Sequence, residues 1–582
     1  MIILIKNLWL HISLKRRKQF LALLLLMIST SFFEVLSIGA VIPFLGVLTS
    51  PDLIFDHNMA QPFVQIIGAT SADQLLLPIT IVFALAIFLA GLLRMLLLWV
   101  TMRLSFATGA DFSINIFRRT LYQPYKVHVA RNSSEVINGI TNKTNTVIFN
   151  IIIPSVLMIN GLFLMTAILS ILLFINIKMT LIAIAGFGFL YLIVIKTTRN
   201  MVSNNSEYIA SGSTELIKSL QEGLGGIRDI LIDGAQETYS KNYQASDIKL
   251  RRAMGNNQFI GESPRFAIEV LGVILIAGIA YSLTLQENGL STAIPILGAL
   301  ALGAQRLLPV LHQEYAGWTA IKSGEASLRD ALELLDQPLP DYAHHSQSEL
   351  LPFNNDIKFE NVAFSYDPKM PIVLNNINLL IKKGSQVGFL GSTGAGKSTL
   401  LDILMGLLVP TKGCLMVDDI EIGKENYRAW QGHIAHVPQF IFLSDCSIEE
   451  NIAFGVKKND IDHERIRGVV KQAQLVDVID ALPQKYQTIV GEQGVRLSGG
   501  QRQRIGIARA LYKQADVIIL DEATSALDAK TEVAVMKAIE ESSDNLTILI
   551  IAHRISTLKN CSQIIELDGT GINIKDYKEI SV

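Results

Sequence analysis

The chain has 582 residues, half of them hydrophobic, with a mean hydropathy of +0.38 and a net charge of −2 at neutral pH. This length allows two to four domains, and the nearly balanced charge gives no support for a nucleic acid or another polyanion as a partner. The composition therefore favours a membrane protein with a soluble part over a soluble enzyme that acts on nucleic acid.

The N-terminus combines an apolar segment with a basic cluster. Residues 1–14 are apolar and include Trp9, and four basic residues follow at positions 15–18. This pattern predicts a helix that lies in the membrane interface. A secretory signal peptide would also begin with basic residues, but the apolar run that follows is too long and lacks a small-residue cleavage site.

Six apolar segments are long enough to cross a bilayer, for which about 20 residues suffice. The first covers residues 20–50 and contains a single charge, Glu34. The others lie near residues 75–101, 147–176, 179–197, 265–285 and 291–313. We therefore predict an all-α transmembrane domain at residues 1–325, with six spans.

The distribution of basic residues orients these spans. Residues 50–74 and 286–292 contain no Lys or Arg, whereas residues 102–146 contain six. Because cytoplasmic loops are enriched in basic residues, the N-terminus and the C-terminal domain are expected in the cytoplasm. Lys178, in the short turn between the third and fourth spans, runs against this trend.

The polar parts of the chain define the remaining organisation. Residues 102–146 and 198–264 mix charge with helical spacing and read as cytoplasmic extensions of membrane helices. A polar, Pro-containing stretch predicts a linker at 326–355, which leaves 356–582 as an α/β domain with an α-helical subdomain. All three cysteines lie in this last domain, where we expect reduced thiols without a disulfide: Cys414, Cys446 and Cys561.

A glycine-rich loop is the first functional motif of the C-terminal domain. It consists of Gly391, Ser392, Thr393, Gly394, Ala395, Gly396, Lys397, Ser398 and Thr399. A strand-like segment precedes it and a helical segment follows, which is the order of a phosphate-binding loop rather than of a simple turn that opens a helix. In such a loop backbone N–H groups surround the phosphates, Lys397 reaches the outer phosphates and Ser398 binds Mg²⁺.

Two carboxylates, Asp521 and Glu522, end a later strand-like segment. A phosphoryl-transfer site must hold Mg²⁺ and must orient a water molecule for in-line attack. We therefore assign Asp521 to the metal and Glu522 to the role of general base. Between the loop and this strand lies the sequence Leu-Ser-Gly-Gly-Gln at residues 497–501. These motifs predict ATP hydrolysis with ATP and Mg²⁺ as cofactors.

Together the motifs resemble the ATP-binding cassette (ABC) family over roughly residues 356–582. The resemblance implies that Tyr366 stacks on adenine, Gln439 contacts Mg²⁺ and His553 contacts the terminal phosphate. It also implies a set of residues that contact the ATP held by a second cassette: Ser498, Gly499, Gly500, Gln501 and Asp528. The plainer alternatives are a half-buried strand tyrosine at 366 and a core histidine at 553.

The chain contains one copy of each motif, so the resemblance implies half a transporter. Since Glu522 is intact, a homodimer with two competent sites is the simplest assembly. Six spans that precede the cassette resemble the exporters of this family, with the type I ABC exporter fold. In that fold short transverse helices dock on the cassette and transmit its closure, and residues 122–125 and 223–233 are the candidates here. Nucleotide would then bias a two-state switch.

Three charges inside or near the spans are the candidates for substrate contact: Glu34, Arg94 and Arg306. A charge at the centre of a bilayer costs about 2.5–3.5 kcal/mol on insertion scales, so such residues usually face protein or a water-filled path. Either the arginines snorkel and the set neutralises itself, or the arginines pair with a phosphate or carboxylate group of an amphiphile.

Short segments of the N-terminal half resemble the bacterial lipid-linked oligosaccharide flippase subfamily. They include the external segment at 51–74, which has an apolar face, and residues 131–134 and 306–309. The resemblance implies movement of a polyprenyl-linked glycan or related glycolipid to the outer leaflet of the bacterial inner membrane. A general lipid, multidrug or peptide exporter would carry the same cassette motifs and stays open as an alternative. An ATP-gated channel or regulator is disfavoured because every hydrolytic residue is present.

Overall fold

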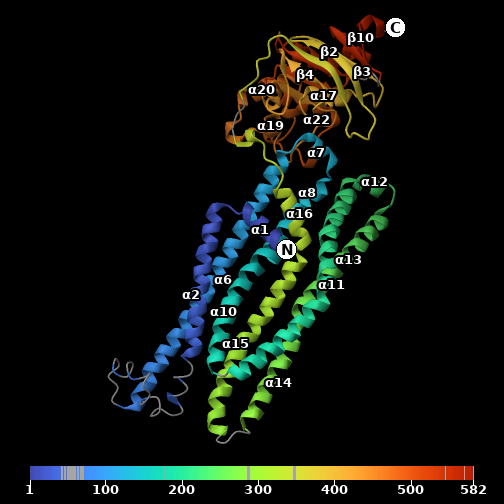
Figure 1. Ribbon diagram of the computed structural model, residues 1–582. Coiled ribbons are helices and arrows are strands. Elements are labelled where there is room, and N and C mark those ends of the chain that lie inside the picture. Colours follow the sequence, from blue (N-terminus) through green and yellow to red (C-terminus); the bar gives the residue numbers. More distant parts are fainter. Residues whose placement is uncertain are drawn as a thin grey trace. The chain divides into compact units, whose positions relative to one another are not determined.

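The structure is a computed structural model of the chain. It describes residues 1–582 except 41–43, 45–46, 49–54, 56–60, 62–64, 66–70, 176, 285–288, 345–348, 544, 553, 569–570 and 581–582, and for several further positions, Arg306 among them, it describes only the backbone. The chain forms two compact units, shown in Figure 1: residues 1–123 with 128–340, and residues 124–127 with 341–582.

The first unit is all helical. Its long helices are α2 (Leu14–Gly39), α6 (Leu76–Leu121), α10 (Ile153–Ile175), α11 (Ile177–Gly225), α13 (Gln236–Glu262), α14 (Pro264–Thr284) and α15 (Gly289–Ser323). Its short helices are α1 (Ile2–His11), α8 (Ser133–Asn138), α9 (Thr144–Thr146), α12 (Ile227–Ile232) and α16 (Glu325–Leu335). Helix α7 (Tyr125–Ala130) has its first three residues in the second unit and the others in the first.

Four helices among the described residues are long and apolar enough to cross a membrane: Leu14–Ser37, Leu76–Leu121, Ser133–Ser170 and Thr180–Gly225. They coincide with the first four predicted spans. The fifth and sixth predicted spans lie on α14 and α15, whose side chains are only partly described. The total of six therefore stays a prediction.

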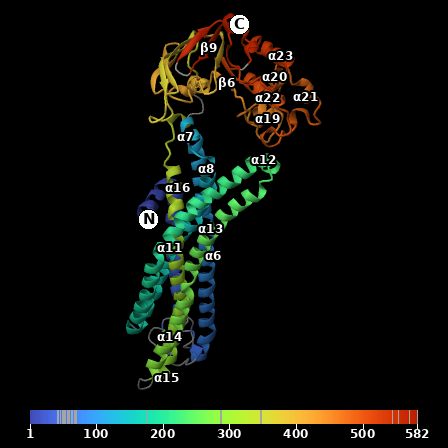
Figure 2. The ribbon, with the colours of Figure 1, turned by 90° about the vertical axis from the view of Figure 1, so that its right-hand side faces the viewer.

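The polar segments after two of the spans continue the same helices. The helix α6 has 46 residues and α11 has 49. At about 1.5 Å per residue each is about 70 Å long, more than twice the hydrocarbon core of about 30 Å. Figures 1 and 2 show α11 and α13 side by side, with α12 at the turn between them. Helix α12 lies within the predicted transverse segment at 223–233.

Helix α16 extends the first unit beyond the expected end of the transmembrane domain at residue 325. Its apolar residues recur at spacings of three and four, which gives one buried face that includes Leu328 and Leu335. This face packs in a core shared with α1, α2 and α6. Lys143 donates a hydrogen bond to Asp330 at 2.5 Å. The unit therefore ends at Pro340.

The second unit contains two sheets. The four-stranded sheet has the order β2 (Leu374–Lys382), β1 (Asp356–Phe364), β4 (Lys412–Val417) and β5 (Ile420–Glu421). The six-stranded sheet has the order β10 (Ile572–Lys575), β9 (Gln563–Leu567), β3 (Gln386–Gly391), β8 (Thr547–Ile551), β7 (Val517–Asp521) and β6 (Ile434–Val437). All pairs in the six-stranded sheet are parallel except β10 with β9.

Helices surround these sheets: α17 (Lys397–Leu404), α18 (Tyr427–Gln431), α19 (Ile448–Ile452), α20 (His463–Gln472), α21 (Val476–Asp480), α22 (Gly499–Tyr512), α23 (Ala529–Glu540) and α24 (Tyr577–Ile580). Every residue of β8 is buried, as expected for a strand covered on both faces. The three cysteines are free thiols.

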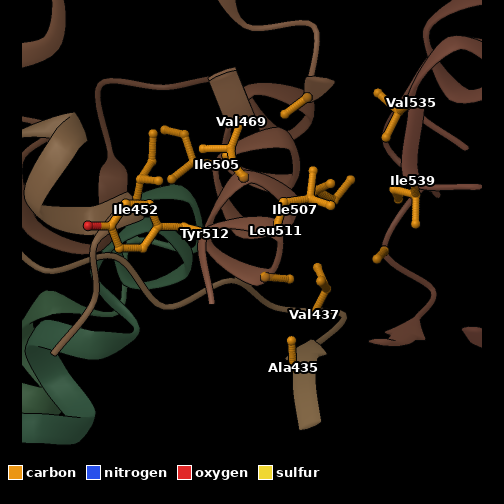
Figure 3. Packing of buried hydrophobic residues seen from close by; sticks show 14 of the residues in the cluster. Ala435, Val437, Ile452, Val469, Ile505, Ile507, Leu511, Tyr512, Val535 and Ile539 are labelled. Carbon is orange, nitrogen blue, oxygen red and sulfur yellow. The ribbon is translucent and has the colours of Figure 1, made fainter. Parts of the chain in front are cut away.

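One hydrophobic core joins α22 to the sheet. Ile505 and Ile507 of α22 belong to the same buried cluster as Val469 of α20, Val437 of β6 and Ile539 of α23, as Figure 3 shows. The motif at residues 498–501 lies at the start of α22. Close packing of this core therefore fixes that motif relative to the strand that carries the two carboxylates.

Candidate functional site

Several of the predicted motifs follow parallel strands at one edge of the six-stranded sheet. Ile551 of β8 is in register with Phe389 of β3 and with Asp521 of β7. Because the carboxyl ends of parallel strands meet at one edge, the loop after β3, the carboxylates of β7 and Gln439 after β6 come together. His553 follows β8 but lies outside the described residues.

The backbone of the phosphate-binding loop requires its glycines. Gly391, Gly394 and Gly396 have φ values of 148°, 87° and 94°, in the region that favours glycine. A Cβ atom at Gly391 would lie 2.5 Å from the carbonyl oxygen of Leu567. Helix α17 begins directly after the loop, so its first amides and its positive dipole end favour a phosphate there.

Lys397 and Tyr366 are held beside this loop. The Lys397 Nζ donates hydrogen bonds to the carbonyl oxygens of Gly391 at 2.6 Å and Ser392 at 3.0 Å. The ammonium therefore lies within the loop that would surround the phosphates. The hydroxyl oxygen of Tyr366 lies 3.0 Å from the hydroxyl oxygen of Thr399 in the first turn of α17. Tyr366 is half-buried and adjacent to the loop, so an adenine-stacking role stays a prediction.

The predicted base and the predicted metal-side glutamine are in direct contact. The Gln439 Nε2 donates a hydrogen bond of 2.6 Å to the Glu522 Oε2. Glu522 has a φ of 51°, which is uncommon outside glycine. Backbone conformations of this kind cost about 1–3 kcal/mol and cluster at functional sites. The local backbone therefore turns the Glu522 carboxylate towards Gln439 at the end of β7.

Asp402 is a third carboxylate at this edge that the sequence reasoning missed. Burial, together with a smaller contribution from the nearby charge of Asp521, raises the pKa of Asp402 to about 6. Asp402 lies on α17 four residues after Ser398, so the two side chains share one face of the helix. That spacing was the signal in the sequence, but the burial of the side chain was not visible there.

The residues assigned to a second cassette's ATP serve as helix caps in this chain. Ser498 and Gln501 form a reciprocal capping box at the start of α22, with the Ser498 Oγ accepting from the Gln501 backbone N–H at 3.3 Å. The Asp528 Oδ2 accepts a hydrogen bond from the Thr531 N–H at 3.1 Å and caps α23. Caps leave other amides of the first turn available. A contact of these residues with a second cassette's ATP stays a prediction.

Two buried polar residues that the sequence reasoning missed link these segments. The Gln503 Oε1 accepts from the Ala526 N–H at 2.9 Å, and its Nε2 donates to the Ser525 Oγ at 3.1 Å. The Glu532 Oε1 accepts hydrogen bonds from the hydroxyls of Thr524 at 2.9 Å and Thr557 at 2.8 Å. The Glu532 Oε2 pairs with the Arg554 guanidinium at 3.2 Å. The segment after Glu522 is therefore tied to α22 and to the chain that follows β8.

The residues present fit a magnesium ion. Ser398, Gln439 and Asp521 supply only oxygen ligands, which Mg²⁺ prefers together with phosphate oxygens and water. Because the Gln439 amide donates through its nitrogen to Glu522, its oxygen is available for the metal. Among the described residues no cluster of three or more His, Cys, Asp or Glu side chains could hold a metal alone.

Part of one predicted transverse segment, at residues 122–125, groups with the cassette, while residues 122–123 belong to the helical unit. Residues 124–127 belong to the second unit. Burial raises the pKa of Tyr125, and the charges of Asp402 and Tyr366 contribute to the shift. The other segment, at 223–233, groups with the helical unit.

Two of the three intramembrane charges pair with each other. Glu34 on α2 and Arg94 on α6 form an ion pair, and the Glu34 side chain is only 3% exposed. This contact is the arrangement that mutual neutralisation would produce. The side chain of Arg306, on α15, lies outside the described residues.

A phosphate-binding loop, an acidic strand end and apolar spanning helices define a membrane-bound ATPase. The sequence model of the ABC transporter family matches residues 374–525. The chain is 30% identical to an ATP-dependent lipid A-core flippase of Chromobacterium violaceum over 77% of this chain and 76% of the relative. It is 38% identical to a leukotoxin translocation ATP-binding protein of Mannheimia glucosida over 46% of this chain and 37% of the relative.

A solved structure of a bacterial Atm1-family ABC exporter with ATP bound has the same fold, with a TM-score of 0.77, 22% identity, and coverage of 97% of this chain and 96% of that one. The chain belongs to the ABC transporter family and has the exporter fold. The predicted family, fold class and ATPase activity coupled to transport are thereby confirmed.

Proposed function

We propose that the chain is one half of a homodimeric flippase that uses ATP to move a lipid-linked oligosaccharide or a related glycolipid to the outer leaflet. The observation that carries this proposal is the alignment with a lipid A-core flippase over about three quarters of both chains. Such an alignment extends beyond the ATPase domain, which alone does not specify a cargo.

A homodimer follows from the presence of one copy of each ATPase motif in the chain. One chain supplies one phosphate-binding loop and one α22 start, and both are intact. Two copies would place each α22 start against the phosphate held by the other copy's loop, where its amides and dipole favour an anion. The homodimer is therefore the simplest assembly with two competent sites.

The site residues divide the work of hydrolysis. Lys397 and the amides of residues 391–396 would hold the phosphates, and Ser398, Gln439 and Asp521 would hold Mg²⁺, which neutralises charge on the phosphates. Glu522 would orient the attacking water and accept its proton. Because Gln439 donates to Glu522 through Nε2, its side chain connects the position of the base to the metal. His553 would contact the terminal phosphate.

An anionic cargo would act on the charges in the spans. The Arg94 guanidinium pairs with Glu34, and a phosphate group of a lipid-linked glycan would compete for the same fork of donors. Arg306 would supply a second cation. Competition of this kind would couple the presence of cargo to the packing of α2 against α6.

The distribution of basic residues supports the location. The excess of Lys and Arg at residues 102–146 favours a cytoplasmic N-terminus and cassette, and a bacterial inner membrane is the location that we propose. The cargo would then be taken from the leaflet on the side where ATP is available.

A general lipid, multidrug or peptide exporter is the second candidate. The relative from Mannheimia glucosida, named for leukotoxin translocation, shares 38% identity over less than half of either chain. A relative can therefore be strongly similar to part of this chain and still be named for a different cargo.

The proposal is tested by ATP hydrolysis of the full chain in lipid vesicles, with and without a polyprenyl-linked oligosaccharide. We expect the added lipid to stimulate hydrolysis, and we expect Glu522→Gln to hydrolyse at the background rate in both conditions. Hydrolysis that depends on Glu522 but does not respond to the glycolipid would reject this cargo and favour the second candidate.

A further inference from the structure

An open groove runs between α2 and α6, which pack side by side (Figure 1). Its volume is about 950 Å³. Pockets that take small organic ligands span about 300–1,000 Å³. The groove is therefore large enough for part of a lipid.

The groove has an apolar wall and a basic end. Its apolar lining includes Leu23 and Leu26 of α2 and Val100 of α6, and its basic residues are Arg16 and Arg103. The basic cluster at 15–18 precedes the first span, and the second predicted span ends at residue 101. With the spans as predicted, the two arginines would lie at one border of the membrane and the leucines at the depth of the acyl chains.

Trp99 marks the same border. It lines the groove and is 60% exposed. Tryptophan is enriched where the hydrocarbon core meets the headgroups, because its ring is apolar and its N–H is polar. An exposed tryptophan at this position is consistent with a surface that contacts lipid.

The two arginines differ in how their charge is compensated. The Arg16 Nε donates to the Asp111 Oδ2 at 2.9 Å, so a carboxylate matches its charge. The Arg103 guanidinium lies 5.7 Å from the centre of the Trp99 ring. Within the part of the chain that the structure describes, no carboxylate pairs with Arg103. A stacked guanidinium keeps its N–H groups available for a bidentate acceptor such as a phosphate.

We propose that this groove binds one anionic phospholipid of the surrounding leaflet, with its phosphate on Arg103 and an acyl chain along the apolar wall. Charge complementarity selects this occupant. The groove joins one uncompensated cation at the membrane border to an apolar surface at membrane depth, and the cytoplasmic leaflet is rich in anionic lipids. The site is separate from the Glu34–Arg94 pair and does not depend on the identity of the cargo.

Quenching of Trp99 fluorescence by brominated acyl chains measures this binding directly. The full chain is reconstituted in phosphatidylcholine vesicles that contain increasing fractions of brominated phosphatidylglycerol or, for comparison, brominated phosphatidylcholine. The chain has four tryptophans, and Trp99→Phe gives the signal of the other three for subtraction. We expect half-quenching of Trp99 at about a fivefold lower fraction of the anionic lipid, since one basic residue near an anionic surface contributes about that factor.

Matched variants test whether Arg103 causes the preference for the anionic lipid. Arg103→Gln should quench equally with both lipids, and Arg103→Lys, which keeps the charge but loses the planar fork, should show a smaller preference than the native chain. Arg118→Gln is the control, because Arg118 also stacks on an aromatic ring, 6.0 Å from the centre of Tyr122, on the same helix but outside the groove. It should keep the full preference.

Four results would overturn the proposal. The first is equal quenching of Trp99 by the two brominated lipids in the native chain, and the second is a preference that survives Arg103→Gln. The third is recovery of fluorescence when a small amount of polyprenyl-linked oligosaccharide is added, which would make the groove a path for cargo. Millimolar inorganic phosphate should leave the quenching unchanged, and displacement by phosphate alone would mean that the groove does not recognise a lipid.

Discussion

The two units of this chain bring their functional residues together in different ways. In the cassette, residues that are adjacent in the sequence form the functional loop, and glycines with positive φ at 391, 394 and 396 dictate its shape. In the helical unit, the charges that matter meet across helices, as Glu34 and Arg94 do from positions sixty residues apart. The ATPase motifs can therefore be recognised from short segments of the sequence. The environment inside the spans depends on which helices pack together, and the sequence alone does not show that.

The largest effect should come from the predicted base. Replacing Glu522 with Gln removes the group that accepts the proton of the attacking water, and general base catalysis contributes about 10²–10⁴-fold. We expect a loss of ATP hydrolysis of that size with ATP binding retained. Glu541→Gln is the control, since that side chain is 67% exposed, and it should hydrolyse ATP normally. Rapid hydrolysis by Glu522→Gln would remove Glu522 from its assigned role.

Replacing either partner of the Glu34–Arg94 ion pair should destabilise the chain, but by different amounts. Arg94→Gln leaves the buried Glu34 carboxylate without its partner, and breaking a buried pair in this way costs about 3–5 kcal/mol. Glu34→Gln leaves Arg94, which is 57% exposed and can reach a polar environment, so it should cost less. Thermal unfolding in detergent compares the two variants. Equal destabilisation by the two variants would show that the ion pair does not stabilise the packing of α2 against α6.

The loop glycines offer a test of local geometry. Alanine at Gly391 would place a Cβ atom 2.5 Å from the Leu567 carbonyl oxygen and would require a φ of 148°. We expect a destabilisation of about 1–3 kcal/mol and weaker ATP binding, measured by unfolding and by nucleotide titration. At Gly468, inside α20, a Cβ atom meets nothing within 4 Å. Gly468→Ala should therefore stabilise the chain slightly.

His436 provides the smallest effect, through pH. Burial lowers the pKa of His436 to about 4, below the unfolded value of about 6.5. Between these values the unfolded chain binds more protons, so stability falls as the pH falls. At pH 5.5 the loss relative to pH 8 should be about 1 kcal/mol, and His436→Gln should remove it.

Sequence reasoning succeeded where one segment determines the result. The order of strand, loop and helix around Lys397 and the first four spans could be read from glycine spacing and hydropathy. It missed contacts between distant segments, such as the burial of Asp402 beside Asp521 and the links made by Gln503. It also read residues 326–340 as linker, because the partners that bury one face of α16 come from helices far earlier in the chain.

ATP hydrolysis in the cassette should drive a glycolipid across the membrane. The most direct measurement follows a fluorescent polyprenyl-linked oligosaccharide in vesicles that hold the purified chain, with a reagent that reaches only one leaflet. We predict that ATP moves the lipid between leaflets in the native chain and not in Glu522→Gln. ATP hydrolysis without any change in the leaflet distribution of this lipid would contradict the account.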